Sequence, residues 1–214
     1  MVLDVGAGPN TSLFSYINSR AGVYTALDKN SDFLDKQKET GAITMKGDVR
    51  SLPFKDDSFD ISHTRFVISH LGLEKQKAVE EVLRVTKPQG KAIFMEYDWT
   101  TAHGSPFFER VKYFMINGGL LFDADFGAEL EATVKGSGLN GAISTTKHPA
   151  THMTDYLQIL NLREAGTTDL RMQGDEAGVT EWNKILNDFQ KETEDINAPG
   201  FYFPGIVVVT VRKD

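Results

Sequence analysis

VLDVGAGPNTSL, residues 2–13, places an apolar β-strand directly before two glycines and the start of a helical pattern. A glycine turn between a strand and a helix lets backbone amides approach a ligand closely, as in nucleotide-binding α/β proteins. The dinucleotide fingerprint GxGxxG requires a glycine at its sixth place, where this chain has Thr11. Asp4, just before the turn, would repel a pyrophosphate and would favour a cationic ligand group. The alternative is that its carboxylate only ties down its own loop.

From this turn outward, short β-type runs alternate with helical patterns. The β-type runs cover residues 1–5, 23–27, 42–46, 59–63 and 91–97, and apolar residues at helical spacing cover residues 11–20 and 74–85. Such alternation predicts βαβ units and a parallel sheet. Beyond residue 100, the pattern predicts helices at 106–121, 125–135, 154–164 and 180–194, a strand at 141–146, and a final strand, GIVVVTVRKD, at 205–214.

Two further carboxylates follow predicted strands. Asp28 lies about 20 residues after the glycines, where an acid accepts hydrogen bonds from ribose hydroxyls. Asp48 follows the next predicted strand and is placed to accept from the exocyclic amine of adenine. Each acid alone is also typical of a turn or a helix cap. Together with Asp4, they favour an adenosine cofactor that carries a cationic group, and S-adenosylmethionine carries an ammonium and a sulfonium.

On these residues the chain resembles class I S-adenosylmethionine-dependent methyltransferases, in the small-molecule branch that includes the ubiquinone and menaquinone biosynthesis type. LDVGAGPN resembles the first family motif and ALDKN the ribose-binding acid. GDVRSLPFKDDSFDISHTRFVISHL resembles the adenine segment and fourth strand, and EEVLRVTKPQGKAIFMEYDW the segment through strand five. The resemblance is dense over residues 2–99 and thin afterwards. Asn10 stands where a third glycine is frequent, and Gln89 departs from the usual KPGG.

The resemblance implies an α/β, Rossmann-like sheet of seven strands in the order 3-2-1-4-5-7-6, with helices on both faces. Strand 7 would be antiparallel and would be formed by residues 205–214. The implied cofactor is S-adenosyl-L-methionine, with S-adenosyl-L-homocysteine as its product. By the same resemblance, the cofactor-binding residues would be Asp4, Val5, Gly6, Ala7, Gly8, Asp28, Lys29, Asp48, Val49 and Thr64.

We expect a single domain over residues 1–214. Its core would comprise residues 1–99, 125–147 and 205–214, and the insertions 100–124 and 148–204 would form a helical lid. Ligands of open α/β sheets bind outside the carboxyl ends of the strands, which both insertions should overlie. Aromatic side chains of the insertions would line an apolar acceptor pocket, the alternative for each being ordinary core packing: Phe107, Phe108, Tyr113, Phe114, Tyr156, Trp182, Phe201, Tyr202 and Phe203.

Methyl transfer requires little covalent chemistry from the protein, because proximity and in-line orientation supply much of the rate enhancement. If an acceptor needs a general base, the best-placed catalytic candidates are His63 and Asp98, although His63 can equally be a local hydrogen-bonding residue. The candidate substrate-pocket residues are Arg65, Tyr97, Trp99 and His103. We predict no metal site, because a proline interrupts the only helically spaced pair of histidines, at positions 148 and 152.

The composition of the chain disfavours some classes of binding partner. The net charge of −7 disfavours a nucleic-acid partner, and the chain has no cysteine, which excludes disulfides and thiolate chemistry. No apolar run reaches the roughly 20 residues that span a bilayer. We therefore expect a cytoplasmic protein without a membrane partner.

The predicted function is methyl transfer from S-adenosylmethionine to an oxygen, nitrogen or carbon atom of a small-molecule acceptor. One alternative is a regulatory or assembly protein that binds the cofactor without turnover, and an NAD-dependent oxidoreductase is disfavoured by Asp4 and Thr11. Enzymes of the resembled type usually carry helices before the first strand, which begins here at Val2. We therefore expect that the lid insertions substitute for these helices, that a second subunit of a homodimer covers the site, or that the chain is a fragment or shortened relative. Our hypothesis is that it binds the cofactor more weakly than a longer relative does.

Overall fold

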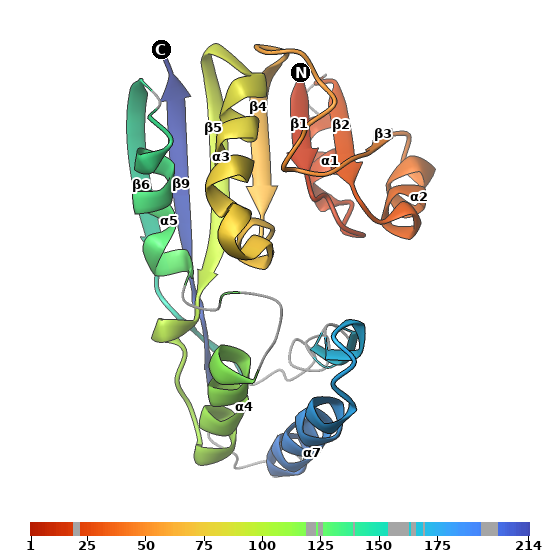
Figure 1. Ribbon diagram of the computed structural model, residues 1–214, viewed down its shortest axis with the longest axis vertical. Coiled ribbons are helices and arrows are strands. Elements are labelled where there is room, and N and C mark those ends of the chain that lie inside the picture. Colours follow the sequence, from red (N-terminus) through yellow and green to blue (C-terminus); the bar gives the residue numbers. More distant parts are fainter. Residues whose placement is uncertain are drawn as a thin grey trace. The chain divides into compact units, whose positions relative to one another are not determined.

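The computed structural model describes residues 1–18, 22–118, 123, 126–138, 140–153, 163, 166–168, 170–193 and 201–214. Its main sheet has seven strands in the order β3-β2-β1-β4-β5-β9-β6 (Figure 1). Strands β7 and β8 form a separate two-stranded sheet. The strands of the main sheet are β1 (Val2–Val5), β2 (Tyr24–Asp28), β3 (Ile43–Lys46), β4 (Phe59–Arg65), β5 (Thr86–Asp98), β6 (Gly141–His148) and β9 (Gly205–Lys213). The small sheet pairs β7 (Thr151–Met153) with β8 (Phe201–Phe203) in antiparallel fashion.

The strand order confirms the predicted topology. Strand β1 pairs in parallel with both β2 and β4, β2 pairs in parallel with β3, and β4 pairs in parallel with β5. The last strand, β9, lies between β5 and β6 and runs in the opposite direction to β4 and β5 (Figure 1). The parallel pairing of β1 and β2 brings the carboxyl ends of both strands to one edge of the sheet.

Helices cover the main sheet because its strands present apolar side chains on both faces. The helices are α1 (Ser12–Asn18), α2 (Ser31–Glu39), α3 (Lys75–Val85) and α5 (Phe126–Gly136), with a 3-10 helix, η1 (Ile68–Glu74), before α3. Three apolar residues of α1 pack on one face, against Val2, Tyr24 and Ala26. Buried apolar residues of α3, at positions 78, 79, 82 and 83, follow helical spacing and form the stripe that faces the sheet.

Several predicted boundaries were wrong by a few residues, and local chemistry explains two of them. The helix predicted at 106–121 is α4, Pro106–Asn117, which ends where the Gly118 amide donates to the Phe114 carbonyl. The helix predicted at 180–194 is α7, Glu176–Thr193, which begins earlier because Asp175 accepts from the Gly178 amide at 2.8 Å. The helix predicted at 154–164 lies, apart from residue 163, outside the described residues.

The strand predicted at 91–97 is the second half of β5, which starts at Thr86. Its pairing with β4 shifts register between Phe59 and Ile61. Gln89, where glycine is usual, adopts a positive φ of 63°. Gly90 is required for a different reason: a Cβ there would lie 2.8 Å from the carbonyl oxygens of Asp60 and of residue 87.

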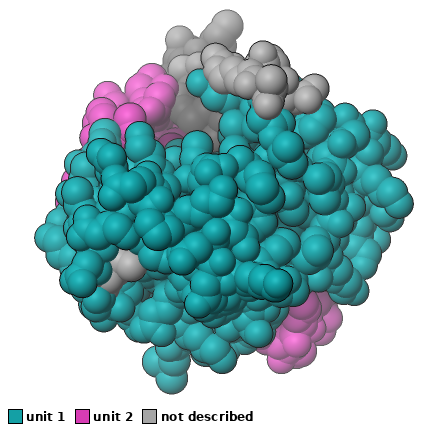
Figure 2. Space-filling model, turned by 90° about the horizontal axis from the view of Figure 1, so that it is seen from above, with its two compact units in different colours: residues 1–96, 129–146, 207–214 teal, residues 97–128, 147–206 magenta. Residues whose placement is uncertain are grey.

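The chain divides into two compact units (Figure 2). Unit 1 comprises Met1–Glu96, Glu129–Thr146 and Val207–Asp214, and unit 2 comprises Tyr97–Ala128 and Lys147–Ile206. The organisation as a single domain and the lid position of the insertions stay predictions. Within the described residues, no helix is long and apolar enough to cross a membrane.

The core of unit 2 includes five of the aromatic side chains that the sequence offered for an acceptor pocket. Helices α4 and α7 meet through Phe114 and Trp182, whose rings stack at 5.1 Å, and Phe108 stacks on Phe201 at 4.8 Å. These four side chains and Phe203 are buried, so ordinary core packing, the alternative given above, accounts for them. The exposed members are those at positions 107, 113 and 202, and Tyr156 lies outside the described residues.

Candidate functional site

The candidate site is centred on the glycine turn after β1. Gly6 and Gly8 have φ angles of 69° and 60°, which side chains other than glycine adopt at a cost. The amides of Gly6 and Ala7 both donate to the Leu27 carbonyl, at 2.7 and 3.1 Å, so the turn is tied to the end of β2. A Cβ at Gly6 would clash with a methyl group of Val67, whereas a Cβ at Gly8 would meet none of the described residues within 4 Å. Gly8 therefore keeps an open side on which a ligand could approach the backbone.

Asp28, at the end of β2, is hydrogen-bonded to this turn. One carboxylate oxygen accepts from the Gly8 amide at 3.0 Å, and the other accepts from the Asn30 amide at 2.8 Å. A carboxylate has about four lone-pair sites, so about two stay available for hydroxyl donors of a ligand. The arrangement suits a vicinal diol beside the glycine turn.

Gln37 of α2 is a supporting residue that the sequence analysis missed. Its side-chain amide donates to the Gly8 carbonyl at 3.0 Å and to the Asn10 carbonyl at 2.9 Å, and the residue is fully buried. A polar residue one helical turn from Leu34, on the buried side of the helix, was the signal that could have identified it. Gln37 thus fixes the path of the chain just after the glycines.

Asp4 lies in β1 and is hydrogen-bonded to two side chains of neighbouring strands. One oxygen accepts from the Tyr24 hydroxyl at 2.7 Å, and the other lies 3.1 Å from Nδ1 of His63. Burial, and then the Asp4 charge, raise the pKa of Tyr24 far above its usual value, so the phenol stays a donor. The carboxylate is almost fully buried. Each of its two oxygens thus already has a hydrogen-bond partner within the protein. Contact of Asp4 with a cationic ligand group stays a prediction.

His63, Thr64 and Arg65 follow one another at the end of β4. In the tautomer whose Nδ1 donates to Asp4, Nε2 of His63 is the acceptor. Thr64 is fully buried, and its hydroxyl has no hydrogen-bond partner among the described residues. The guanidinium of Arg65 lies 5.9 Å from the ring centroid of Phe66. Of the three, His63 has the chemistry of a proton acceptor.

Asp48 is engaged by Arg50 rather than free. Its carboxylate accepts from the Arg50 amide at 2.9 Å and from two guanidinium nitrogens at 2.8 and 2.5 Å. The Arg50 hydrogen bonds lower the pKa of Asp48 to about 2, and the charge of exposed Lys29 acts in the same direction. About one lone-pair site is left for an adenine amine. Val49, the other predicted adenine contact, is largely buried.

The remaining predicted residues belong to unit 2. Asp98 accepts from the Thr100 amide at 3.1 Å and so caps a short 3-10 helix, η2 (Trp99–Thr101). Trp99 is buried, and Tyr97 packs edge-on against it. His103 is exposed and stacks on Tyr202 with ring centroids 4.2 Å apart. The structure thus groups the predicted cofactor residues with His63 and Arg65 in unit 1, and Tyr97, Asp98, Trp99 and His103 in unit 2.

Glu96, the last residue of unit 1 on β5, is a buried carboxylate that the sequence analysis did not identify. It accepts from the amides of Val67 and Ile68, at 3.0 and 2.7 Å, and from the Ser69 hydroxyl at 2.9 Å. Burial raises its pKa to about 7, while these hydrogen bonds act in the opposite direction. No local pattern in the sequence marks such a residue, since its partners lie 27–29 positions away.

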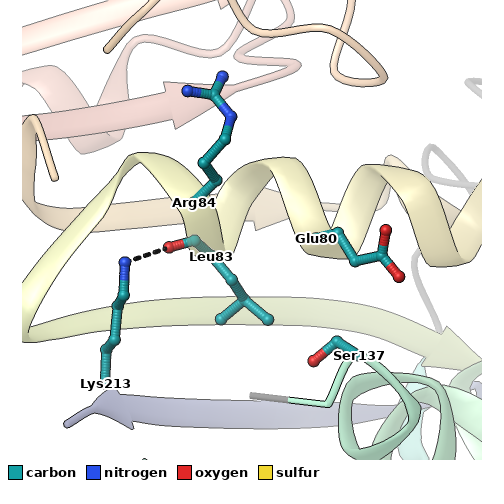
Figure 3. A pocket seen from close by; sticks show the side chains of 5 residues that line it. All are labelled: Glu80, Leu83, Arg84, Ser137 and Lys213. Atoms are coloured by element: carbon teal, nitrogen blue, oxygen red, sulfur yellow. Dashed lines mark hydrogen bonds between the residues drawn. The ribbon is translucent and has the colours of Figure 1, made fainter. Parts of the chain in front are cut away.

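A surface pocket elsewhere in unit 1 is lined by Glu80, Leu83, Arg84, Ser137 and Lys213 (Figure 3). Lys213 donates to the carbonyls of Leu83 and Thr86, at 3.2 and 2.8 Å, and Arg84 pairs with Glu81 and Asp56. Both cations are therefore already engaged. None of the lining residues is a predicted site residue.

Comparison with known proteins finds relatives of the segment that carries the glycine turn and Asp28. Residues 3–94 match a family described as a methyltransferase domain. A demethylmenaquinone methyltransferase of Paenarthrobacter aurescens is 38% identical over 98 residues, which cover 45% of this chain and 38% of that protein. The chain therefore spans less than half the length of that relative.

Solved structures extend the likeness over the whole chain. The YcgJ protein of Bacillus subtilis gives a TM-score of 0.64 at 20% identity, over 100% of this chain and 92% of that chain. Phosphoethanolamine N-methyltransferase 2 of Haemonchus contortus, solved in complex with S-adenosyl-L-methionine, gives 0.59 at 16% identity, over 100% of this chain and 48% of that chain. At such identities the likeness establishes the fold alone.

Proposed function

Since the chain has the fold of a class I methyltransferase, we propose that it transfers a methyl group from S-adenosyl-L-methionine to an oxygen, nitrogen or carbon atom of a small molecule. The observation that carries this proposal is the contact between the glycine turn and Asp28. It presents an open backbone at Gly8 beside a carboxylate with acceptor capacity to spare.

The residues present fit this cofactor. Gly6 to Gly8 would face its methionine part with backbone groups, and Asp28 would accept from the ribose hydroxyls. Asp48 retains acceptor capacity for one adenine donor, next to the backbone of Val49. Exposed Lys29 lies between the two acids in sequence and adds a donor at the same edge.

The cofactor supplies a methyl group activated by its sulfonium, so the protein's task is mainly to bind and to orient. His63 would accept a proton at Nε2 where the acceptor loses one, and Asp4 would stabilise the resulting imidazolium through Nδ1. Asp98 is the second candidate base, although it already caps η2. Arg65 would pair with an anionic group of the acceptor.

The name of the demethylmenaquinone methyltransferase relative supports a small-molecule acceptor, and a net charge of −7 argues against nucleic acid. Tyr97, Trp99 and His103 remain the residues that we propose for the acceptor pocket. We also propose a cytoplasmic location, because the chain has no cysteine. We further propose that the protein assembles as a homodimer, which a measurement of its mass in solution by light scattering tests.

The proposal is tested by incubating the protein with S-adenosylmethionine and a panel of quinones, phenols and amines, with S-adenosylhomocysteine measured by mass spectrometry. Product formation that depends on one class of acceptor is expected. Cofactor binding without product over the whole panel would favour the alternative of a binding protein without turnover. A nicotinamide-dependent rise in melting temperature, with no response to S-adenosylmethionine, would contradict the proposal.

A further inference from the structure

Glu96 connects β5 to the segment that follows β4. Three donors of that segment, the amides of Val67 and Ile68 and the hydroxyl of Ser69, converge on its one carboxylate. The residue before them, Phe66, has a φ of 58°, a conformation that a bulky side chain adopts at a cost. The Phe66 amide donates to the Met95 carbonyl at 2.8 Å, so β5 holds this segment through two successive residues.

The same segment forms one wall of the glycine turn. The methyl groups of Val67 lie so close to Gly6 that a Cβ there would clash with them. Gly6 is in turn fixed to the end of β2 through the Leu27 carbonyl. A shift of Val67 would therefore change the packing against Gly6, whose backbone would bind the cofactor.

Burial of a carboxylate is unfavourable unless hydrogen bonds compensate for the loss of water, and an apolar residue would fill the same place in the sheet at a lower cost. Glu96 is 1% exposed and lies on the same face of β5 as buried Ala92 and Phe94. What distinguishes it from these neighbours is its set of three donors. The carboxylate thus links β5 to the Val67–Ser69 segment by three hydrogen bonds.

We propose that Glu96 is a positioning residue of the cofactor site. It fixes Val67 against Gly6, so that the glycine turn has its binding conformation before the cofactor arrives. This inference rests on the proposed function, because it assigns the turn to S-adenosylmethionine. Glu96 itself touches neither cofactor nor acceptor.

The test compares the whole chain with three variants. Glu96→Gln keeps the shape: its carbonyl can accept from both amides, and its NH2 group can donate to Ser69. Glu96→Leu fills the space without any acceptor. Thr86→Val is the control, because it removes a buried hydrogen bond to Ser62 at the other end of β5, away from the turn. Calorimetry measures the affinity for S-adenosylhomocysteine, and NMR measures hydrogen exchange of the Val67 and Ile68 amides without ligand.

We expect Glu96→Leu to bind S-adenosylhomocysteine about tenfold more weakly and to exchange both amides faster, as the loss of the three hydrogen bonds predicts. Glu96→Gln should restore most of the affinity, and Thr86→Val should bind like the unmodified chain. If Glu96→Leu does not fold, Ser69→Ala removes one of the three bonds and should weaken binding about threefold.

Unchanged affinity in Glu96→Leu, or in Ser69→Ala where the leucine variant does not fold, would overturn the role of Glu96 while leaving the proposed function intact. An equal loss of affinity in Thr86→Val would also overturn it, since general destabilisation would then explain the effect. Failure of the unmodified chain to bind S-adenosylhomocysteine would instead refute the proposed function, and the positioning role with it.

Discussion

Replacement of Glu96 by glutamine should make the stability of the protein less dependent on pH. Burial raises the pKa of this carboxyl from 4.5 to about 7 in the folded chain. Between these values the unfolded chain has lost the proton that the folded chain retains. The free energy of unfolding therefore falls as the pH rises through this range, by about 3 kcal/mol in all, because one pKa unit corresponds to about 1.4 kcal/mol.

Glutamine has no such titration. The difference in unfolding free energy between the natural chain and Glu96→Gln should therefore shift by about 3 kcal/mol in favour of the variant from pH 4.5 to pH 8. Urea unfolding at intervals of half a pH unit, followed by circular dichroism, measures this difference. Thr86→Val serves as control, since a change without a titrating group should give a constant difference. A constant difference for Glu96→Gln as well would refute the reasoning.

Three further changes test the candidate site. Gly6→Ala should lower the free energy of unfolding by about 2 kcal/mol more than Gly41→Ala does. Gly41 is the control because it also has a positive φ, but none of the described residues lies where its Cβ would be. Equal losses would contradict the packing of Val67 on Gly6. Asp28→Asn should weaken the calorimetric affinity for S-adenosylhomocysteine about tenfold, whereas Asp32→Asn, on the exposed face of α2, should not, and equal affinities would count against the ribose contact. Asp48→Ala should also weaken this affinity, and an unchanged affinity would refute the adenine assignment.

The order of the sheet was predictable because each strand carries its own signal. Apolar runs such as β1 and β2 are buried on both faces, so their sequences mark them without reference to partners. Helix ends were less predictable, as α4 and α7 show, because caps at Gly118 and Asp175 decide them. Helical spacing alone extends past such residues.

Residues of the candidate site were predictable only where they belong to a short motif in the sequence. Gly6, Gly8 and Asp28 could be selected from sequence, and the structure brings them together by hydrogen bonds. Tyr24 and Glu96 could not, because the partner of Tyr24 lies on another strand, the donors to Glu96 lie in the segment after β4, and only tertiary contacts reveal them. The aromatic residues of unit 2 could be recognised in the sequence, but their composition does not show whether they line a pocket or form a core.

The proposed function requires that the glycine turn and Asp28 form a site for S-adenosylmethionine. Calorimetric titration of the 214-residue chain with S-adenosylhomocysteine, with NAD as control, tests it most directly. We expect saturable one-to-one binding of S-adenosylhomocysteine, a loss of affinity in Asp28→Asn, and no heat from NAD. A folded sample that binds NAD, or that binds neither compound, would contradict it.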